Sequence, residues 1–153
     1  TGPSLSPFNA WILSKSLETL AVRVDRHCDN ALELAQFLEG QEKVNWVKYP
    51  FLASHPQHEI AKKQMKKGGN IVTFEIKGGV EAGRSFLNRI NMCSLSANLG
   101  DTRTIVTHPA SSTHSKLSKE ERLEVGITDG LIRISTGLEN ISDIVSDLQQ
   151  ALN

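Results

Sequence analysis

Short strand-like segments alternate with helical segments along the chain, and this alternation constrains the fold more than any other feature of the sequence. The clearest strand-like segment is 70–77, where Val72, Phe74 and Ile76 fall on one side of an extended backbone and polar residues fall on the other. A period of two is typical of a strand with one buried face. Four further strand-like segments are residues 44–49, 93–98, 102–107 and 131–135.

Helical patterns separate these strands. They cover residues 59–66 and 82–90, a segment after Ser118, which forms a capping box with Glu121, and a final segment after Asn140. Strands interleaved with helices indicate one sheet with helices packed on one face. We therefore expect an α/β (α+β) domain with a sheet of about four to five strands covered by helices. The pattern leaves the direction of the strands open.

A long helical stretch is predicted before the first strand. Ser6 can cap it, and Pro7 suits the first helical position. Two apolar stripes follow, and Gly40 is a plausible end of the helix. The first stripe is Leu13, Leu17, Leu20 and Val24, and the second is Ala31, Leu34, Ala35 and Leu38. If the stretch bends, we expect the kink between the two stripes.

The charge and cysteine content of the chain indicate which kinds of binding partner and which compartment to expect. The chain has 153 residues with 17 Lys plus Arg and 17 Asp plus Glu, so its formal net charge is zero. A neutral balance predicts neither nucleic acid nor an anionic membrane as a partner. The two cysteines, Cys28 and Cys93, are too few for a disulfide scaffold. Together with the absence of a signal-peptide pattern and of a membrane-spanning apolar run, this predicts a cytoplasmic protein.

Arg133 is the most informative single residue. It lies within the strand-like segment 131–135, on the opposite face from Ile132 and Ile134. A charged residue in the middle of a strand needs water or an anion, and a guanidinium suits bidentate binding of a carboxylate or phosphate. The alternative is a solvated sheet face, or a pair with an internal acid such as Asp129. The residues alone favour this alternative, because most charged residues are exposed.

The segment Asn98-Leu99-Gly100-Asp101 follows a predicted strand and resembles a tight turn. From spacing alone it is a turn and nothing more. Its amide groups could instead face the carboxylate of a ligand, because successive backbone N–H groups of a turn can form an anion-binding concavity.

Histidines and lysines give weaker signals. His108 and His114 lie in a polar loop, 108–117, which we expect at the surface or along a cleft. No carboxylate or cysteine completes a tetrahedral metal site with them, so metal binding is not predicted. His27 falls among the apolar stripes and is expected to be a hydrogen-bonded core or interface residue. A basic cluster at residues 62–67 is interpreted as a solvated helix face.

Taken together, the motifs resemble the Cys/Met-metabolism family of pyridoxal-phosphate-dependent enzymes. Each motif alone is weak, but the set follows the order of the family along nearly the whole chain. The motifs are Ser6-Pro7-Phe8-Asn9-Ala10-Trp11, Leu17-Glu18-Thr19-Leu20, Arg26-His27, Asn30-Ala31, Gly68-Gly69, Phe74-Glu75, Asn98-Leu99-Gly100-Asp101-Thr102-Arg103-Thr104, His108-Pro109-Ala110-Ser111, Thr113-His114, Gly126-Ile127 and Leu131-Ile132-Arg133-Ile134-Ser135-Thr136-Gly137-Leu138-Glu139.

The resemblance implies the C-terminal small domain of a fold type I enzyme. Residues 1–25 would form an interdomain helix segment and residues 26–153 the C-terminal domain, with the N-terminal cofactor domain absent. The residue matching Arg133 grips the α-carboxylate of an amino-acid substrate in this family, and the residue matching Asn98 lies beside that carboxylate. The expected partners are a small amino-acid substrate, the N-terminal cofactor domain and, at full length, three further subunits of a homotetramer.

The form of the turn suggests a branch of the family. Many γ-lyases and cystathionine synthases have Ser where Asn98 stands, followed by Leu-Gly-Gly. The Asn-Leu-Gly-Asp form here resembles the O-acetylhomoserine sulfhydrylase branch, which makes homocysteine from O-acetylhomoserine and sulfide. A cystathionine γ-synthase, a γ-lyase and an O-succinylhomoserine sulfhydrylase stay open as alternatives.

The chain differs from the family in lacking a lysine that matches the cofactor lysine. The lysine that holds pyridoxal 5'-phosphate, with its Ser/Thr surroundings, lies upstream of the Ser6-Pro7-Phe8 segment in the family, and no lysine here has that context. We therefore expect no catalytic residue, no metal and no covalently bound cofactor in this chain, and no activity from the chain alone. A non-catalytic carboxylate-binding domain and a purely structural oligomerisation piece are the rival interpretations.

Overall fold

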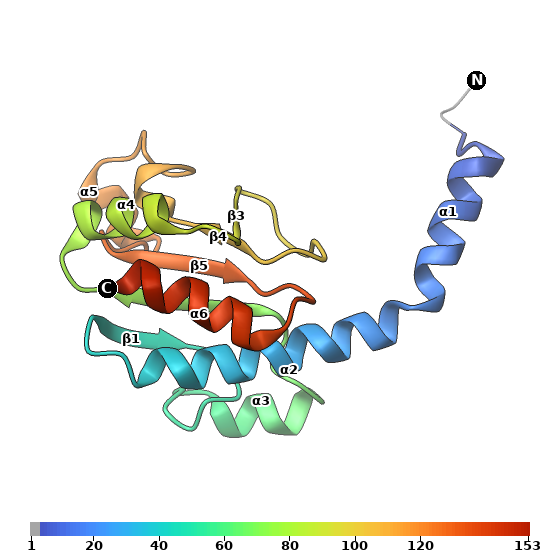
Figure 1. Cartoon of the computed structure of the whole chain (residues 1–153), viewed down its shortest axis with the longest axis horizontal. Helices are drawn as coiled ribbons and strands as arrows, with labels where there is room; N and C mark the ends of the chain where they lie inside the picture. The colour runs from blue at the N-terminus through green and yellow to red at the C-terminus, as the bar shows by residue number, and fades with distance from the viewer. Residues whose placement is uncertain (1–3) are drawn as a thin grey trace.

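A computed structural model describes residues 4–153, and five strands in this part of the chain form one mixed sheet (Figure 1). The strands are β1 (Val44–Lys48), β2 (Ile71–Ile76), β3 (Ser94–Leu95), β4 (Ile105–Thr107) and β5 (Leu131–Ser135). Their order across the sheet is β1-β2-β5-β4-β3, with antiparallel pairs except for the parallel pair of β3 and β4. The predicted α/β class and size of the sheet are confirmed.

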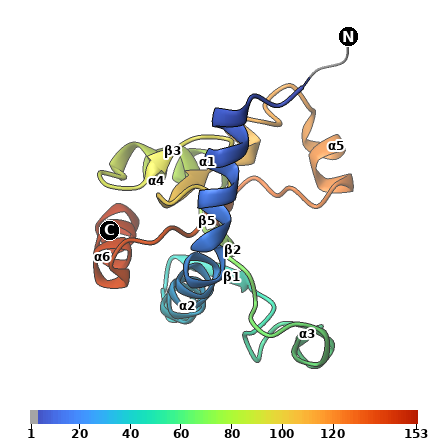
Figure 2. The same cartoon turned by 90° about the vertical axis from the view of Figure 1, so that its right-hand side faces the viewer.

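Helices pack mainly on one face of this sheet. The helices are α1 (Pro7–Glu18), α2 (Leu20–Glu39), α3 (His58–Gln64), α4 (Gly79–Arg89), α5 (Lys119–Glu124) and α6 (Ile141–Leu152). Helices α2 and α4 contact the central strands, and α6 packs against both helices. Figure 2 shows α4 and α6 on one side of the sheet, with α3 and α5 on the other. We call the side of α2, α4 and α6 the covered face and the other side the open face.

The core lies between the sheet and these three helices. Val72 and Phe74 of β2 and Ile132 and Ile134 of β5 are fully buried, as the alternation in segment 70–77 predicts. The ring of Phe74 meets that of Phe86 from α4 edge to face, with 5.8 Å between ring centroids, a favoured arrangement of aromatic pairs. The alternation of the strands therefore determines which side chains enter the core.

The N-terminal helical stretch is broken at a different place from the one predicted. It divides at Thr19 (φ −106°, ψ 6°), inside the first apolar stripe rather than between the two stripes. The residues of that stripe, Leu13 to Val24, are all exposed, so no packing keeps them in line on one helix face. Burial in α2 begins only at His27. Helix α1 has no buried residue and projects away from the sheet (Figure 1).

The predicted division at residue 25 falls within α2, which runs through it without interruption. That division stays a prediction, and the first three residues of its N-terminal part lie outside the described residues.

The two strands predicted at 93–98 and 102–107 are shorter than expected. Strand β3 contains only two residues and β4 only three. The segment between them is held by side-chain hydrogen bonds instead of a ladder. The backbone N–H of Asn98 donates to Ser96 Oγ (3.3 Å), and that of Arg103 donates to Asp101 Oδ1 (3.0 Å). Such local bonds compete with strand pairing.

The predicted helix caps are confirmed. Ser118 Oγ accepts from the N–H of Glu121, while the Glu121 carboxylate accepts from the N–H of Ser118, which completes the capping box of α5. Asn140 Oδ1 accepts from the N–H of Ser142 at the start of α6. Among the residues described, no helix combines the length and apolar character needed to cross a membrane.

Candidate carboxylate-binding site

Arg133 lies at the centre of the open face. It pairs with Thr73 of β2 on one side and with Thr107 of β4 on the other. Its neighbours in β5, Ile132 and Ile134, are directed into the core, so the guanidinium leaves the sheet on the opposite side. The predicted placement of Arg133 on the face opposite the core is therefore confirmed.

The guanidinium is held by main-chain carbonyl groups and not by an acid. Arg133 Nη2 donates to the carbonyl oxygens of Ala97 (2.7 Å) and Asn98 (3.1 Å). Its Nε is buried and has no hydrogen-bond partner among the residues that the structure describes. Asp129, the internal acid considered above, pairs instead with Arg122 (2.6 Å) and Lys119 (3.1 Å). The Arg133–Asp129 pair is therefore absent, and the guanidinium keeps donor capacity for a ligand.

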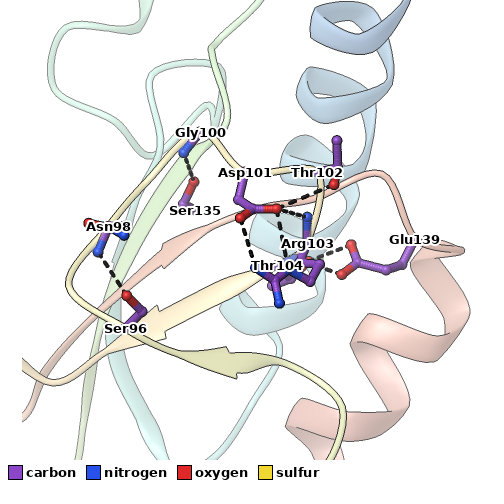
Figure 3. A network of polar contacts seen from close by, with 9 residues as sticks. All are labelled: Ser96, Asn98, Gly100, Asp101, Thr102, Arg103, Thr104, Ser135 and Glu139. Carbon is purple, nitrogen blue, oxygen red and sulfur yellow. Dashed lines mark hydrogen bonds and ion pairs between the residues drawn. The ribbon is translucent and has the colours of Figure 1, made fainter.

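The turn that follows Ser96 is brought directly over Arg133. Figure 3 shows this turn with its hydrogen bonds to Ser96 and Ser135. Asn98 is exposed, so its side chain is accessible from solvent. Gly100 has a positive φ of 79°, a conformation that glycine adopts without strain. Its backbone N–H donates to Ser135 Oγ at 2.9 Å. The structure thus joins the two residues that the sequence singles out, because Arg133 bonds to the carbonyl of Asn98 itself.

The segment after the turn is fastened to the chain that leaves β5. The carboxylate of Glu139 accepts from the backbone N–H of Thr104 (2.6 Å) and from its hydroxyl (2.9 Å). The same hydroxyl accepts from the N–H of Gly137 (2.9 Å). Beside this contact, hydrogen bonds from the Arg103 guanidinium hold the pKa of the Asp101 carboxyl well below its usual range. Sequence reasoning did not identify this role of Glu139, because its partner is thirty-five positions away.

Helix α2 supports the same segment from the other side. His27 Nδ1 lies 2.7 Å from the carbonyl oxygen of Thr136. The amide of Asn30 donates to the carbonyls of Gly137 (3.0 Å) and Glu139 (2.9 Å). Both side chains are buried, which confirms the expected hydrogen-bonded core position of His27. Residues 136–139 are therefore held between α2 and residue 104.

A small cavity of about 190 Å³ lies beside this junction. Leu20, Val24 and His27 of α2 line it on one side, and Asn70 and Gly100 line it on the other. Because both Leu20 and Gly100 line this cavity, the first turns of α2 lie close to the turn that contacts Arg133.

The loop 108–117 was expected at the surface or along a cleft, and this holds for residues 111–117, which are exposed or partly exposed, but not for the buried residues 108–110. The His108 side chain is fully buried, with Nδ1 2.8 Å from Ser111 Oγ and Nε2 2.8 Å from the carbonyl oxygen of Asp129. Burial lowers the pKa of its imidazole and so favours the neutral ring. Strand β4 delivers residues 107–110 into the interior, a long-range effect that polarity alone does not reveal.

No group of three or more potential metal-ligating side chains gathers anywhere in the chain from residue 4 onward.

The lysines of the chain do not fit a covalent cofactor site. A lysine that reacts with an aldehyde must be uncharged, and burial is what lowers its pKa. Every lysine that the structure describes is exposed except Lys67, which is half-buried. Lys67 Nζ contacts Asp29 (2.7 Å) and Asp25 (3.3 Å), and the hydrogen bond to Asp29 raises its pKa. The described residues thus offer donors for a carboxylate, but no lysine of the reactive kind.

Comparison with known proteins agrees with the fold and the motifs. A family model described as "Cys/Met metabolism PLP-dependent enzyme" matches residues 1–153. An L-methionine gamma-lyase of Fusobacterium nucleatum subsp. polymorphum is 51% identical over 152 residues, which are 99% of this chain and 38% of that protein. An O-acetyl-L-homoserine sulfhydrylase of Leptospira meyeri is 47% identical over 99% of this chain and 35% of its own length.

A solved structure is also similar. It is a putative O-acetylhomoserine (thiol)-lyase from Campylobacter jejuni, crystallised with N'-pyridoxyl-lysine-5'-monophosphate, and it matches with a TM-score of 0.89 and 44% identity. The match covers 99% of this chain and 36% of that chain. The predicted fold type I architecture is confirmed by this likeness. The chain spans less than two fifths of the length of these relatives.

Proposed function

The chain belongs to the Cys/Met metabolism PLP-dependent enzyme family, and from this premise we propose that it forms the substrate-carboxylate-binding part of an O-acetylhomoserine sulfhydrylase. The observation that carries the proposal is the Arg133 guanidinium, which lies against the Asn98 turn and, among residues 4–153, has neither an acidic partner nor a hydrogen-bond partner for its buried Nε. An amino-acid substrate supplies the missing anion with its α-carboxylate.

Arg133 has the right chemistry for this task. Nη2 is already fixed by two carbonyl groups, so the plane of the guanidinium is set before a ligand arrives. Its remaining N–H groups can bind a carboxylate without first losing the freedom of the side chain. Holding the carboxylate sets the orientation of the amino acid against the reacting centre, and orientation of this kind can remove several kcal/mol from a barrier.

Asn98 provides a second contact for the same carboxylate in this proposal. Its backbone carbonyl faces Arg133 while its side chain is exposed. An amide N–H₂ group is a hydrogen-bond donor that fits a carboxylate oxygen. The two residues would therefore act together, with the charge on Arg133 and the neutral donor on Asn98.

The cofactor lysine belongs, in this proposal, to a part of the enzyme outside these 153 residues. The wide apolar surface of α1 and the first turns of α2 supports this, because Phe8, Trp11 and Leu17 are 57–66% exposed. Exposed apolar patches of this kind mark contacts with other protein surfaces. The isolated chain should therefore give no specific lysine adduct when it is treated with pyridoxal 5'-phosphate and borohydride, and an adduct at one lysine would contradict the proposal.

The substrate is tested with the full-length protein that contains this chain. Purified enzyme loaded with pyridoxal 5'-phosphate is given O-acetylhomoserine and sulfide, and homocysteine is measured. A second sample is given methionine alone, and release of methanethiol is measured. A rate of homocysteine formation that exceeds the rate of methanethiol release supports the sulfhydrylase.

The second candidate is a methionine γ-lyase, which the 51–52% identity to proteins of that name favours. Faster methanethiol release from methionine would replace the sulfhydrylase with this lyase. The Asn-Leu-Gly-Asp form of the turn is the feature that favours the sulfhydrylase.

A further inference from the structure

Strand β5 presents two polar side chains in succession on the open face, Arg133 and Ser135. Residues two apart in a strand point the same way. Both of them bind the turn at residues 97–100, one at each end. Arg133 holds the carbonyls of Ala97 and Asn98, and Ser135 Oγ accepts from the N–H of Gly100.

We propose that Ser135 is a positioning residue that fixes the Asn98 turn above Arg133, and that its hydroxyl thereby sets the geometry of carboxylate binding. The inference rests on the proposed function, since it concerns the same substrate group. Without Ser135, Arg133 would hold the beginning of the turn, and the next contacts would be those of Thr102 and Thr104, beyond its end. The Ser135 contact attaches Gly100 itself and so restricts movement of the turn relative to the guanidinium.

The surroundings of Ser135 make its hydroxyl the group that holds Gly100. The residue is fully buried, and its oxygen accepts from Gly100 N–H (2.9 Å) and from Asn70 Nδ2 (3.1 Å). These two bonds use both lone pairs of a hydroxyl oxygen. Ile71 and Ile105 face Ser135 from the neighbouring strands and offer no polar side-chain atom. Loss of the hydroxyl would leave the Gly100 N–H without its partner.

The backbone of residue 135 has a separate task. It pairs with Ile71 in β2 and Ile105 in β4 as part of the ladder. Replacing serine by alanine removes the hydroxyl and leaves these main-chain positions intact. The substitution therefore separates the position of the turn from the integrity of the sheet.

The kinetic test uses the full-length enzyme loaded with pyridoxal 5'-phosphate. Loss of one hydrogen bond to a neutral partner in Ser135→Ala should raise KM for the amino-acid substrate roughly 2- to 12-fold, while kcat changes less. Ser135→Thr keeps the hydroxyl and should restore KM. Ser146→Ala, on the exposed surface of α6, is the matched control and should behave as wild type. An unchanged KM in Ser135→Ala overturns the proposal.

The structural test does not depend on turnover. Hydrogen exchange of the peptide covering residues 97–103 is followed by mass spectrometry in the same proteins. Exchange should become faster in Ser135→Ala and stay unchanged in Ser146→Ala. Unchanged exchange in Ser135→Ala would show that the hydroxyl does not hold the turn.

A second variant covers the case in which Ser135→Ala folds poorly. Gly100→Ala strains the turn through its positive φ, while the added Cβ meets no atom within 4 Å. It should give the same rise in KM and the same faster exchange with the core intact. Wild-type KM and exchange in this variant would contradict the proposal.

The failure of the proposed function can be told apart from the failure of this inference. If the wild-type enzyme acts on neither O-acetylhomoserine nor methionine, the proposed function fails, and with it the expected change in KM. The exchange data still decide whether Ser135 holds the turn.

Discussion

The two faces of strands β2 and β5 carry different tasks. On the covered face, Val72, Phe74, Ile132 and Ile134 are fully buried under helices. On the open face, Thr73 and Arg133 are partly accessible, and β5 contacts the Asn98 turn through Arg133 and Ser135. Because neighbouring residues of one strand point to opposite faces, the core residues and the residues of the proposed carboxylate site fall at alternate positions. The comparison teaches that substitutions can change one of these properties without the other.

The largest expected effect is on the covered face. Phe74→Ala should lower the free energy of unfolding by about 3–5 kcal/mol, because it removes a buried ring and leaves a cavity beside Phe86. Thr73→Ala, one residue away on the open face, should change it by roughly 0.5 kcal/mol or less. Urea unfolding of the chain followed by circular dichroism measures both values. An equal decrease of the unfolding free energy in the two variants would show that the two faces do not differ in their contribution to stability.

The next effect is on the open face and concerns activity. In the full-length enzyme, Arg133→Ala should reduce kcat/KM by about 10- to 150-fold, which corresponds to about 1.5–3 kcal/mol for a hydrogen bond to a charged group. Its melting temperature should stay near that of wild type, because Arg133 has no acidic partner in the described chain. Arg133→Lys should restore little, since an ammonium cannot reproduce the planar fork. Wild-type kinetics in Arg133→Ala would remove Arg133 from the site.

The covered side also contains a buried carboxylate, Asp147 of α6. Burial alone would raise its pKa, but the backbone N–H groups of Cys93, Asn91 and Met92 donate to it at 2.9–3.0 Å and hold the pKa below its ordinary value. A lowered pKa in the folded state means that its stabilising effect is present above the unfolded pKa, about 4, and is lost as the pH falls through the folded value.

Asp147→Asn should therefore cost about 1–3 kcal/mol at pH 7, because the amide keeps only one acceptor oxygen and at least one of the three N–H groups loses its partner. The difference from wild type should shrink as the pH is lowered from 5 towards 2. Urea unfolding at several pH values tests this. A difference that stays constant over the range would mean that the carboxylate charge does not contribute.

The smallest effect is local and falls on the side of α3 and α5. Helix α5 has no buried residue, so it is supported by its capping box and by the ion pairs of Arg122 and Lys119 with Asp129. Ser118→Ala should destabilise this helix by about 1 kcal/mol. Amide exchange of residues 119–124 should become faster, while global unfolding and the exchange of β2 stay unchanged. A lower global stability would show that α5 is coupled to the core.

Local patterns in the sequence were sufficient for several features. The period of two in 70–77 predicts which residues of β2 are buried, and the place of Arg133 between Ile132 and Ile134 predicts its face. The capping box at Ser118 needs only the spacing to Glu121. These features depend on residues within a few positions of one another, so the sequence itself contains them. The specific activity and the roles of Arg133 and Asn98 stay predictions.

Tertiary structure alone decided the rest. The order β1-β2-β5-β4-β3, the burial of His108, the break at Thr19 and the link from Ser135 to Gly100 have no signature in the local pattern. The contacts of His108, Ser135 and Glu139 join residues 21–35 positions apart. Such contacts depend on which strands become neighbours, because the polar atoms that meet across a sheet are chosen by register and packing rather than by sequence spacing.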